Sequence, residues 1–423
     1  MRAAGKSEGL LKHSILLIAF TQVANVSNML FHMVMGRNLP PAEYGVLMAM
    51  TNVILIIGTP LDAVRTSMAH FAGRASSEGR ESDVRGLLIV WGRRLGLVGA
   101  LLSALGMIFS PRVAVFFQLE SPVPVWFTCL TIPALLMIPL MSGALQGLQS
   151  FVWMSLSGHG WFLIRLLLGY SLVRYVAPVA ASGLAAQAGA MVVGAGIGLI
   201  GILLCTAKSR TDPEGFTGVG VYLARSILLV GSFAVLMNAD NILLKRYFRP
   251  EEAGLYARAF TISRLVVFLP MPVAYALFPK VISAGGTSRK ARWMLLGALG
   301  LAAGLIVVAA GVCMILPQVP LGLLYKDWEP TAASVRLLRA ACGAMVPLGL
   351  CYILINFEMA QHRFRSTAGL LTASTLYLAG AGRWHSTPVH IAGVLGCAGA
   401  LALAALIAST FSARTERQRF IRE

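Results

Sequence analysis

The chain has 423 residues, of which 57% are hydrophobic and only 12% are charged. A soluble domain usually carries about 25% charged residues, so the composition excludes an ordinary soluble globular protein. The formal net charge is +18, but a bias of Lys and Arg toward loops on one side of a membrane accounts for most of it, so we predict no nucleic-acid partner.

Long apolar segments indicate a polytopic membrane protein. Residues 177–207, 293–325 and 386–413 contain no Asp, Glu, Lys or Arg, and each is longer than the about 20 apolar residues that a helix needs to cross a bilayer. Continuous apolar segments satisfy their backbone hydrogen bonds as helices rather than as a barrel. We therefore predict an all-α integral membrane protein with about twelve transmembrane helices. The predicted spans lie near residues 14–35, 44–70, 87–110, 123–145, 152–174, 178–206, 219–244, 252–278, 293–316, 332–357, 366–382 and 389–411.

The distribution of Lys and Arg predicts the orientation of these spans. An even number of spans places both termini on one side, and the loops on that side carry most of the Lys and Arg, including Arg74, Arg85, Lys208 and Arg292. The positive-inside rule then predicts that both termini are cytoplasmic. Residues 1–13 place basic side chains before an apolar segment without a small-residue cleavage site, so we interpret them as the start of a retained first span.

The first span and the turn after it have a counterpart in the second half of the chain. N-V-S-N (25–28) followed by LPPAEYGV (39–46) resembles N-A-D-N (238–241) followed by FRPEEAGL (248–255), and a long span with an internal proline follows each copy. The copies fall on the first and second spans of two six-span halves, which predicts two lobes related by a parallel pseudo-two-fold repeat, with a substrate site where they meet. The predicted lobes are residues 1–207 and 208–423.

Several conspicuous motifs are interpreted as structural. The glycine-rich segment 189–201 could be taken for a nucleotide loop, but inside an apolar helix its small residues allow close packing. Asn238 and Asn241 are interpreted as bonding across helices rather than holding an ion. His159, between glycines in the fifth span, is interpreted as a packed or cavity-lining side chain. The six cysteines lie in apolar segments without a C-x-x-C pair or a His at ligand spacing, so we predict no metal site and no cofactor.

Cations inside the predicted spans are candidates for a transport site, because an ionisable side chain in hydrocarbon is costly and usually lines a pathway. Arg264 in the eighth span and Arg165 in the fifth lie roughly 20 Å from the start of their spans, near the middle of the bilayer. Arg258 lies one or two turns from the outer end. We predict that these cations and Arg65 line a cavity, where the planar guanidinium suits a diphosphate. Arg264 and Arg165 could instead neutralise a carboxylate or carbonyl cluster.

Two carboxylates share the predicted membrane region with these cations. Asp62 lies three residues before Arg65, toward the inner end of the second span, so the two side chains lie on one helix face. They either form a self-neutralising pair or belong to a cavity. Asp240 lies near the outer end of the seventh span. Asp62 and Asp240 are therefore the candidate cavity or ion-coupling acids.

Three stretches of the chain resemble a known family. SGALQGLQSF (142–151) is similar to the LQG-x-x-x-F signature that closes the fourth span in bacterial polysaccharide transporters of the oligosaccharide-flippase type. DNILLKRYFRPEEAGLYARAF (240–260) and LPMPVAYALFPKVISA (269–284) resemble that family's seventh and eighth spans. The turn GRNLPPAEYGV (36–46) resembles its first-to-second-span turn. The resemblance covers the full length, but residues 290–423 match only in hydropathy.

The resemblance implies a two-lobed helical bundle of the multidrug/oligosaccharidyl-lipid/polysaccharide exporter superfamily, with a MATE-like fold, in the bacterial inner membrane. It implies a flippase, not an enzyme, that moves a polyprenyl-diphosphate-linked oligosaccharide across that membrane by alternating access, as a repeat unit of O-antigen, capsule or exopolysaccharide. Basic cavity residues in such proteins face the diphosphate. Besides this lipid-linked substrate and membrane lipid, the expected partners are polysaccharide polymerase or export proteins.

Other function classes stay open at this point. A cation-coupled exporter of drugs or metabolites on the same fold would need an acidic cavity site, for which Asp62 and Asp240 are the candidates. A membrane enzyme such as a polymerase or ligase would need large outer loops, whereas the longest predicted ones, near 111–122 and 317–331, are short. A structural scaffold of an export complex is the remaining alternative.

Overall fold

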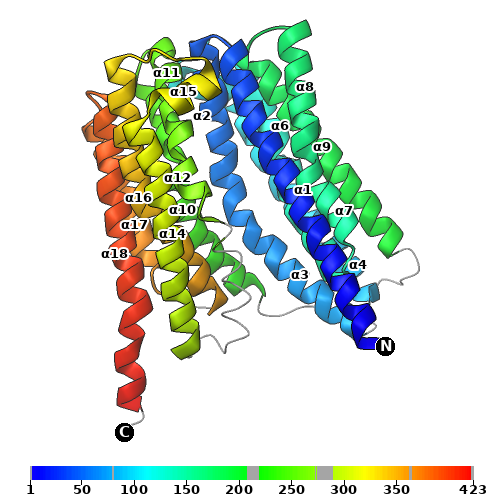
Figure 1. Ribbon diagram of the computed structural model, residues 1–423. Coiled ribbons are helices and arrows are strands. Elements are labelled where there is room, and N and C mark those ends of the chain that lie inside the picture. The colour runs from blue at the N-terminus through cyan, green and yellow to red at the C-terminus, as the bar shows by residue number, and fades with distance from the viewer. Residues whose placement is uncertain are drawn as a thin grey trace. The chain divides into compact units, whose positions relative to one another are not determined.

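The computed structural model describes residues 2–78, 81–206, 219–271, 273, 289–361 and 364–420. Within these ranges every regular element is a helix (Figure 1). The chain forms two compact units, Met1–Leu223 and Ala224–Glu423, referred to below as the N-terminal and the C-terminal unit. The predicted lobe boundary falls at the edge of residues 207–218, which lie outside the described residues, so the predicted lobes and their symmetry stay predictions.

The N-terminal unit is a bundle of long helices, two of which are interrupted. Its elements are α1 (Arg2–Asn38), α2 (Pro41–Gly58), the 3₁₀ turn η1 (Thr59–Leu61), α3 (Asp62–Ser77), α4 (Glu81–Ile108), α5 (Ser110–Phe116), α6 (Val123–Gly147), α7 (Phe151–Ser155), the π-helical turn η2 (Leu156–Gly160), α8 (Trp161–Tyr175) and α9 (Ala180–Cys205).

The C-terminal unit is likewise helical throughout its described residues. Its elements are α10 (Val219–Tyr247), α11 (Pro250–Ser263), α12 (Leu265–Phe268), α14 (Arg289–Ile315), α15 (Gln318–Tyr325), α16 (Ala332–Ala360), α17 (Thr367–Arg383) and α18 (Pro388–Phe420). Most of LPMPVAYALFPKVISA (269–284), including its late Phe-Pro, lies outside the described residues.

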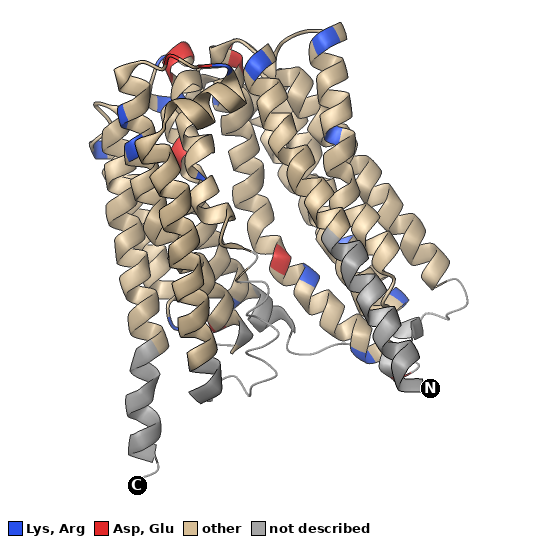
Figure 2. Cartoon of the chain, viewed as in Figure 1, with Lys and Arg blue, Asp and Glu red and all other residues tan. Residues whose placement is uncertain are grey.

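Among the described residues, nine helical stretches are long and apolar enough to cross a membrane, and the chain is a multi-pass membrane protein. They coincide with nine of the predicted spans, namely Pro41–Ser76, Val84–Ile108, Val123–Gly147, Phe151–Tyr175, Ala180–Cys205, Ala224–Tyr247, Trp293–Ile315, Ala332–Met359 and Pro388–Thr410. The other three predicted spans also begin in helices, namely α1, α11 with α12, and α17, which has 17 residues. Most of the Lys, Arg, Asp and Glu residues coloured in Figure 2 lie toward helix ends, and a few lie in the middle of a helix.

The core of the N-terminal unit is built around α6, which packs against α3, α4 and α9. Small residues permit the close contact with α3, because a Cβ on Gly143 would lie 2.3 Å from the carbonyl oxygen of Arg65 and a Cβ on Gly147 would lie 2.6 Å from the backbone nitrogen of Gly73. Glycines of α9 act in the same way, as predicted, since a Cβ on Gly201 would lie 2.8 Å from Trp153. In the C-terminal unit α16 takes the central place and packs against α18, α14 and α11.

Two membrane helices of the N-terminal unit are broken at positions that the sequence explains. The predicted second span bends at η1, where Pro60 has no N–H to donate into the helix (Figure 1). The fifth span widens into the π-helical turn η2, which contains His159 between two glycines. Single π turns inside α-helices are rare and often lie at functional sites. Both breaks lie toward the inner ends of the predicted spans.

Candidate functional site

Arg165 lies inside the N-terminal unit, in α8, with 3% of its surface exposed. Its Nη1 donates to Oε1 of Gln187 on α9 at 3.2 Å, and its Nη2 donates to Oδ1 of Asn28 on α1. Its Nε is buried without a hydrogen-bond acceptor among the described residues. Three helices of one unit therefore hold this guanidinium by neutral amide oxygens.

Aromatic rings cover the remaining faces of the Arg165 guanidinium. Its central carbon lies 4.1 Å from the ring centroid of Phe31 and 5.4 Å from those of Trp161 and Phe162. Cation–π contacts stabilise a guanidinium by about 0.5–2 kcal/mol each, but they add no negative charge. No carboxylate among the described residues lies within ion-pair distance of Arg165. The described residues therefore surround the Arg165 guanidinium with neutral groups.

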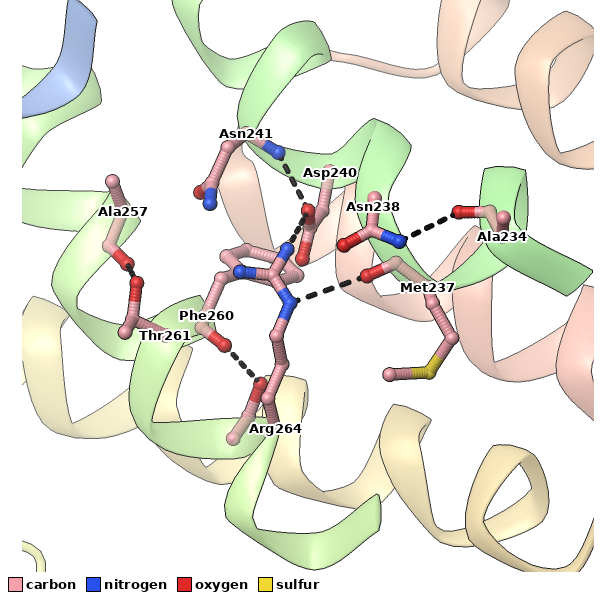
Figure 3. Close-up of polar contacts among 10 residues, drawn as sticks. Ala234, Met237, Asn238, Asp240, Asn241, Ala257, Phe260, Thr261 and Arg264 are labelled. Carbon is pink, nitrogen blue, oxygen red and sulfur yellow. Dashed lines mark hydrogen bonds and ion pairs between the residues drawn. The ribbon is translucent and has the colours of Figure 1, made fainter. Parts of the chain in front are cut away.

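Arg264 lies inside the C-terminal unit at the break between α11 and α12 (Figure 3). Its Nη2 lies 2.6 Å from Oδ1 of Asp240 on α10, and its Nε donates to the backbone oxygen of Met237 at 3.2 Å. The Arg264 and Asp240 side chains are 4% and 0% exposed. The sequence left open whether Arg264 lines a cavity or neutralises a carboxylate, and the geometry is that of a neutralised pair.

Further polar groups surround the Asp240–Arg264 pair. Oδ1 of Asp240 also accepts a hydrogen bond from the backbone nitrogen of Asn241 at 2.7 Å. The Asn241 side-chain amide and the hydroxyl of the fully buried Tyr377, on α17, have no hydrogen-bond partner among the described residues. Tyr377 lies within electrostatic range of both charges of the pair. Asn238 donates to the carbonyl of Ala234 on its own helix, and the predicted bonds across helices stay a prediction.

Asp62 and Arg65 form an exposed ion pair where α3 begins. Arg65 Nε donates to Asp62 Oδ1 at 3.2 Å, and the two side chains are 36% and 64% exposed, respectively. His159, in η2, lies within electrostatic range of both charges. Its Nδ1 is buried and has no hydrogen-bond partner among the described residues. The self-neutralising pair that the spacing allowed is therefore present, together with a histidine whose vicinity the sequence did not indicate.

Arg258 lies apart from these clusters, in the C-terminal unit. Its guanidinium carbon is 5.2 Å from the ring centroid of Tyr325 on α15. Tyr325 itself is buried, whereas Arg258 is half-buried. The predicted cations thus fall into separate environments, and the role of each in binding a substrate stays a prediction.

A buried carboxylate at the end of α16 was missed by sequence reasoning. Glu358 is 2% exposed and accepts hydrogen bonds from Oγ of Ser366, at 2.5 Å, and of Ser409. The predicted tenth span ended at residue 357, so Glu358 was assigned to a loop. An acidic residue in the last turn of an apolar helix, followed by serines, was the available signal. Asn28 was visible in the N-x-x-N motif, whereas nothing in the sequence linked Gln187 to Arg165.

Solved structures of transporters share this fold. A multidrug resistance MATE family transporter of the MOP superfamily, in an inward-facing conformation, matches with a TM-score of 0.71 and 12% identity over 93% of this chain and 96% of that chain. Lipid II flippase MurJ, in an inward closed conformation, matches with a TM-score of 0.69 and 13% identity over 95% and 88%. A MOP superfamily transporter from Pyrococcus furiosus Vc1 with a binding pocket of reverse polarity matches with a TM-score of 0.61 and 13% identity over 96% and 93%.

These likenesses confirm the predicted MATE-like, all-α membrane fold. At 12–13% identity they concern the fold alone. No protein-family model matches the sequence, and no curated protein matches it. The narrower resemblance to polysaccharide transporters of the oligosaccharide-flippase type stays a prediction that depends on the sequence motifs.

Proposed function

We propose that the chain is a flippase that moves a polyprenyl-diphosphate-linked oligosaccharide across the bacterial inner membrane by alternating access. The structural neighbours of the chain include a lipid II flippase, and this likeness supports a lipid-linked substrate. The motif at residues 142–151 supports the oligosaccharide-flippase type. The proposed substrate is a repeat unit of O-antigen, capsule or exopolysaccharide, with polymerase or export proteins as partners, and no enzymatic step is required.

The observation that carries this proposal is the environment of Arg165. A buried guanidinium without a carboxylate is costly, because desolvation is offset only by neutral dipoles and aromatic faces. A diphosphate supplies the missing negative charge, and Arg binds phosphate oxygens in bidentate fashion. Because Phe31 and Trp161 cover the guanidinium, the substrate gains access when these rings move aside. We assign the diphosphate contact to Arg165 first.

The other predicted cations rank below Arg165 in this proposal. Arg264 already has Asp240 as a counter-charge, so an added anion would have to displace or share that carboxylate. Arg65 is paired with Asp62, and Arg258 lies against Tyr325. These three are proposed as cavity residues that a diphosphate can meet along its path, not as its main ligand.

A cation-coupled exporter is the second candidate, and the MATE multidrug transporter among the structural neighbours favours it. Such an exporter needs a carboxylate that can take up a cation. Both candidate acids, Asp62 and Asp240, have an arginine at ion-pair distance, which reduces their attraction for a second cation. Efflux of organic cations by cells that express the chain, lost in an Asp62→Asn variant, would favour the exporter.

Deletion of the gene tests the flippase directly. The expected result is accumulation of lipid-linked oligosaccharide on the cytoplasmic leaflet and loss of the surface polymer, and the wild-type gene should restore both. An unchanged surface polymer in a strain without a redundant transporter would contradict the proposal.

Reporter fusions test the proposed topology in the same strain. Fusions after Arg85 and at the C-terminus should report cytoplasm, whereas fusions near Pro41 and Lys326 should report periplasm.

A further inference from the structure

Two helix breaks bring charged and polar side chains together on the N-terminal unit. Asp62 is the first residue of α3, directly after η1, and Arg65 follows one turn later. His159 belongs to η2, the break in the fifth span, and lies within electrostatic range of both. We name Asp62, Arg65 and His159 the Asp62 cluster. None of these residues is needed for the Arg165 contacts described above.

The Asp62–Arg65 pair of the cluster is exposed although it belongs to a membrane-spanning helix, whereas Nδ1 of His159 is buried. The Asp62 side chain is 64% exposed and that of Arg65 is 36% exposed, within the span Pro41–Ser76. A charged pair at membrane depth faces water or the bundle interior, because contact with lipid tails is too costly. The backbone of Arg65 is held tightly against Gly143 of α6, where a Cβ would lie 2.3 Å from the Arg65 carbonyl oxygen. The cluster is therefore a hydrated site on a rigid support.

The charge of the Asp62 cluster selects against ions. Asp62 repels a phosphate and Arg65 repels a cation, and at 3.2 Å their charges largely cancel. The pair nevertheless offers a strong acceptor beside a strong donor. Nδ1 of His159 is buried and has no hydrogen-bond partner among the described residues. It becomes a third polar atom for a ligand when the imidazole ring turns toward the pair. Vicinal hydroxyl groups, each both a donor and an acceptor, match this arrangement.

From this geometry we infer that the Asp62 cluster binds the hydroxyl groups of a saccharide, and that it adjoins the diphosphate contact at Arg165. The inference rests on the proposed flippase function and deepens it, because it assigns the sugar and the diphosphate to separate places. Arg65, which the sequence grouped with the diphosphate ligands, is thereby assigned to the sugar.

The position of the cluster relative to Arg165 fits a diphosphate joined to its first sugar. His159 and Arg165 are six residues apart on one interrupted helix, which corresponds to about 9 Å along the axis. Trp161 lies between them, and its Nε1 donates to the Gly158 carbonyl at 3.1 Å. Trp161 and Phe162 are partly exposed and stacked with ring centroids 3.8 Å apart. Such a ring pair offers an apolar face to the C–H side of a sugar.

Binding of two lipids to the purified full-length chain in nanodiscs tests the inference. The probes are undecaprenyl diphosphate and the undecaprenyl-diphosphate oligosaccharide purified from the organism that encodes the chain. The wild type should bind the oligosaccharide lipid about tenfold more tightly than the sugarless lipid, as expected for a few hydrogen bonds to charged groups. Asp62→Asn and His159→Gln should each abolish most of that difference, while affinity for the sugarless lipid stays within about twofold.

The structure supplies a matched control on the same helix. Arg74, in the last turn of α3, forms an exposed pair with Glu78, the residue after the helix, with Nε and Oε1 3.0 Å apart. Arg74 lies about two and a half turns beyond Arg65. Glu78→Gln should leave the affinities for both lipids unchanged. Arg165→Gln should weaken both lipids, because it removes the diphosphate contact. Size-exclusion profiles verify that each variant is folded. If Asp62→Asn does not fold, the inference is tested with His159→Gln alone.

The possible outcomes separate this inference from the function on which it rests. If the wild type binds neither lipid, the proposed function fails and the inference fails with it. If the wild type binds both lipids equally, the inference alone is wrong. A higher affinity of Asp62→Asn than of the wild type for the sugarless lipid would show that Arg65 contacts the diphosphate. That result would also overturn the assignment of the cluster to the sugar.

Discussion

Arg165 in the N-terminal unit and Arg264 in the C-terminal unit are both deeply buried, with 3% and 4% of their surfaces exposed. Their partners differ. Arg264 has the Asp240 carboxylate at 2.6 Å and a backbone carbonyl. Arg165 has two amide oxygens and three aromatic rings. Arg264 belongs to an ion pair, whereas Arg165 has no carboxylate within ion-pair distance among the described residues. Two arginines that are equally buried therefore differ in their capacity for an anionic ligand.

The two copies of the N-x-x-N motif differ at one position that bears on this difference. The third residue is Ser27 in N-V-S-N and Asp240 in N-A-D-N. The carboxylate that neutralises Arg264 thus has a small hydroxyl residue as its counterpart in the first copy. Asn28, the last residue of the first copy, contacts Arg165 with a neutral oxygen instead. Depth in the membrane identifies a costly charge, but the neighbouring helix decides whether that charge is available.

The largest effect on stability is expected from breaking the Asp240–Arg264 ion pair. Arg264→Gln leaves Asp240 buried and without its counter-charge, which should destabilise the C-terminal unit by about 3–5 kcal/mol. The measurement is the fraction of protein that stays monodisperse after heating in detergent. Arg264→Gln combined with Asp240→Asn removes both charges and should recover most of the loss. Equal instability of the single and double variants would show that the ion pair contributes little.

Arg165→Gln should have the opposite profile. It removes a charge that has no carboxylate partner while keeping an amide that can donate to Asn28 or Gln187, so thermal stability should change little. Transport per folded molecule should fall by about tenfold to a hundredfold, the effect of losing a charge-assisted hydrogen bond to the substrate. Arg165→Lys should restore part of it, because a point charge replaces a bidentate fork. Wild-type transport by Arg165→Gln would remove Arg165 from the substrate path.

Asn28→Asp would give Arg165 a carboxylate partner like the one that Arg264 has in Asp240. The substitution is nearly isosteric and places a carboxylate oxygen where Oδ1 of Asn28 now accepts from Arg165. We expect a gain in stability of about 1–3 kcal/mol from the charge-assisted bond. Transport should fall by about tenfold, because the new carboxylate competes with the diphosphate. Thermal stability and transport are measured on one preparation, and a rise in both would contradict the assigned role of Arg165.

The sequence was sufficient for the fold because the signals for the fold are local. Apolar length predicts spans such as Ala180–Cys205, and the internal proline noted in the span after the first copy of the motif lies in the break η1. The environment of the charged residues is not local. Arg165 meets Asn28 and Gln187 across three helices, and no spacing rule in one sequence brings these positions together. The Asp62–Arg65 pair could be predicted because its partners are three residues apart on one helix face.

Tyr377→Phe gives the smallest expected effect. It tests whether the Asp240–Arg264 pair is stable without a hydrogen bond from the Tyr377 hydroxyl. The Tyr377 hydroxyl is fully buried, near the Asp240–Arg264 pair, and has no hydrogen-bond partner among the described residues. Removing an unsatisfied buried hydroxyl should be neutral or stabilise the unit by up to about 1 kcal/mol, because its desolvation cost disappears. Thermal stability is compared with that of Tyr170→Phe, an exposed position on α8 that should show no change. A clear loss of stability in Tyr377→Phe alone would mean that the hydroxyl bonds to Asp240. Oδ2 of Asp240, which is buried, would then be occupied as well. The Asp240–Arg264 pair would be more fully satisfied, and the contrast with Arg165 would be larger.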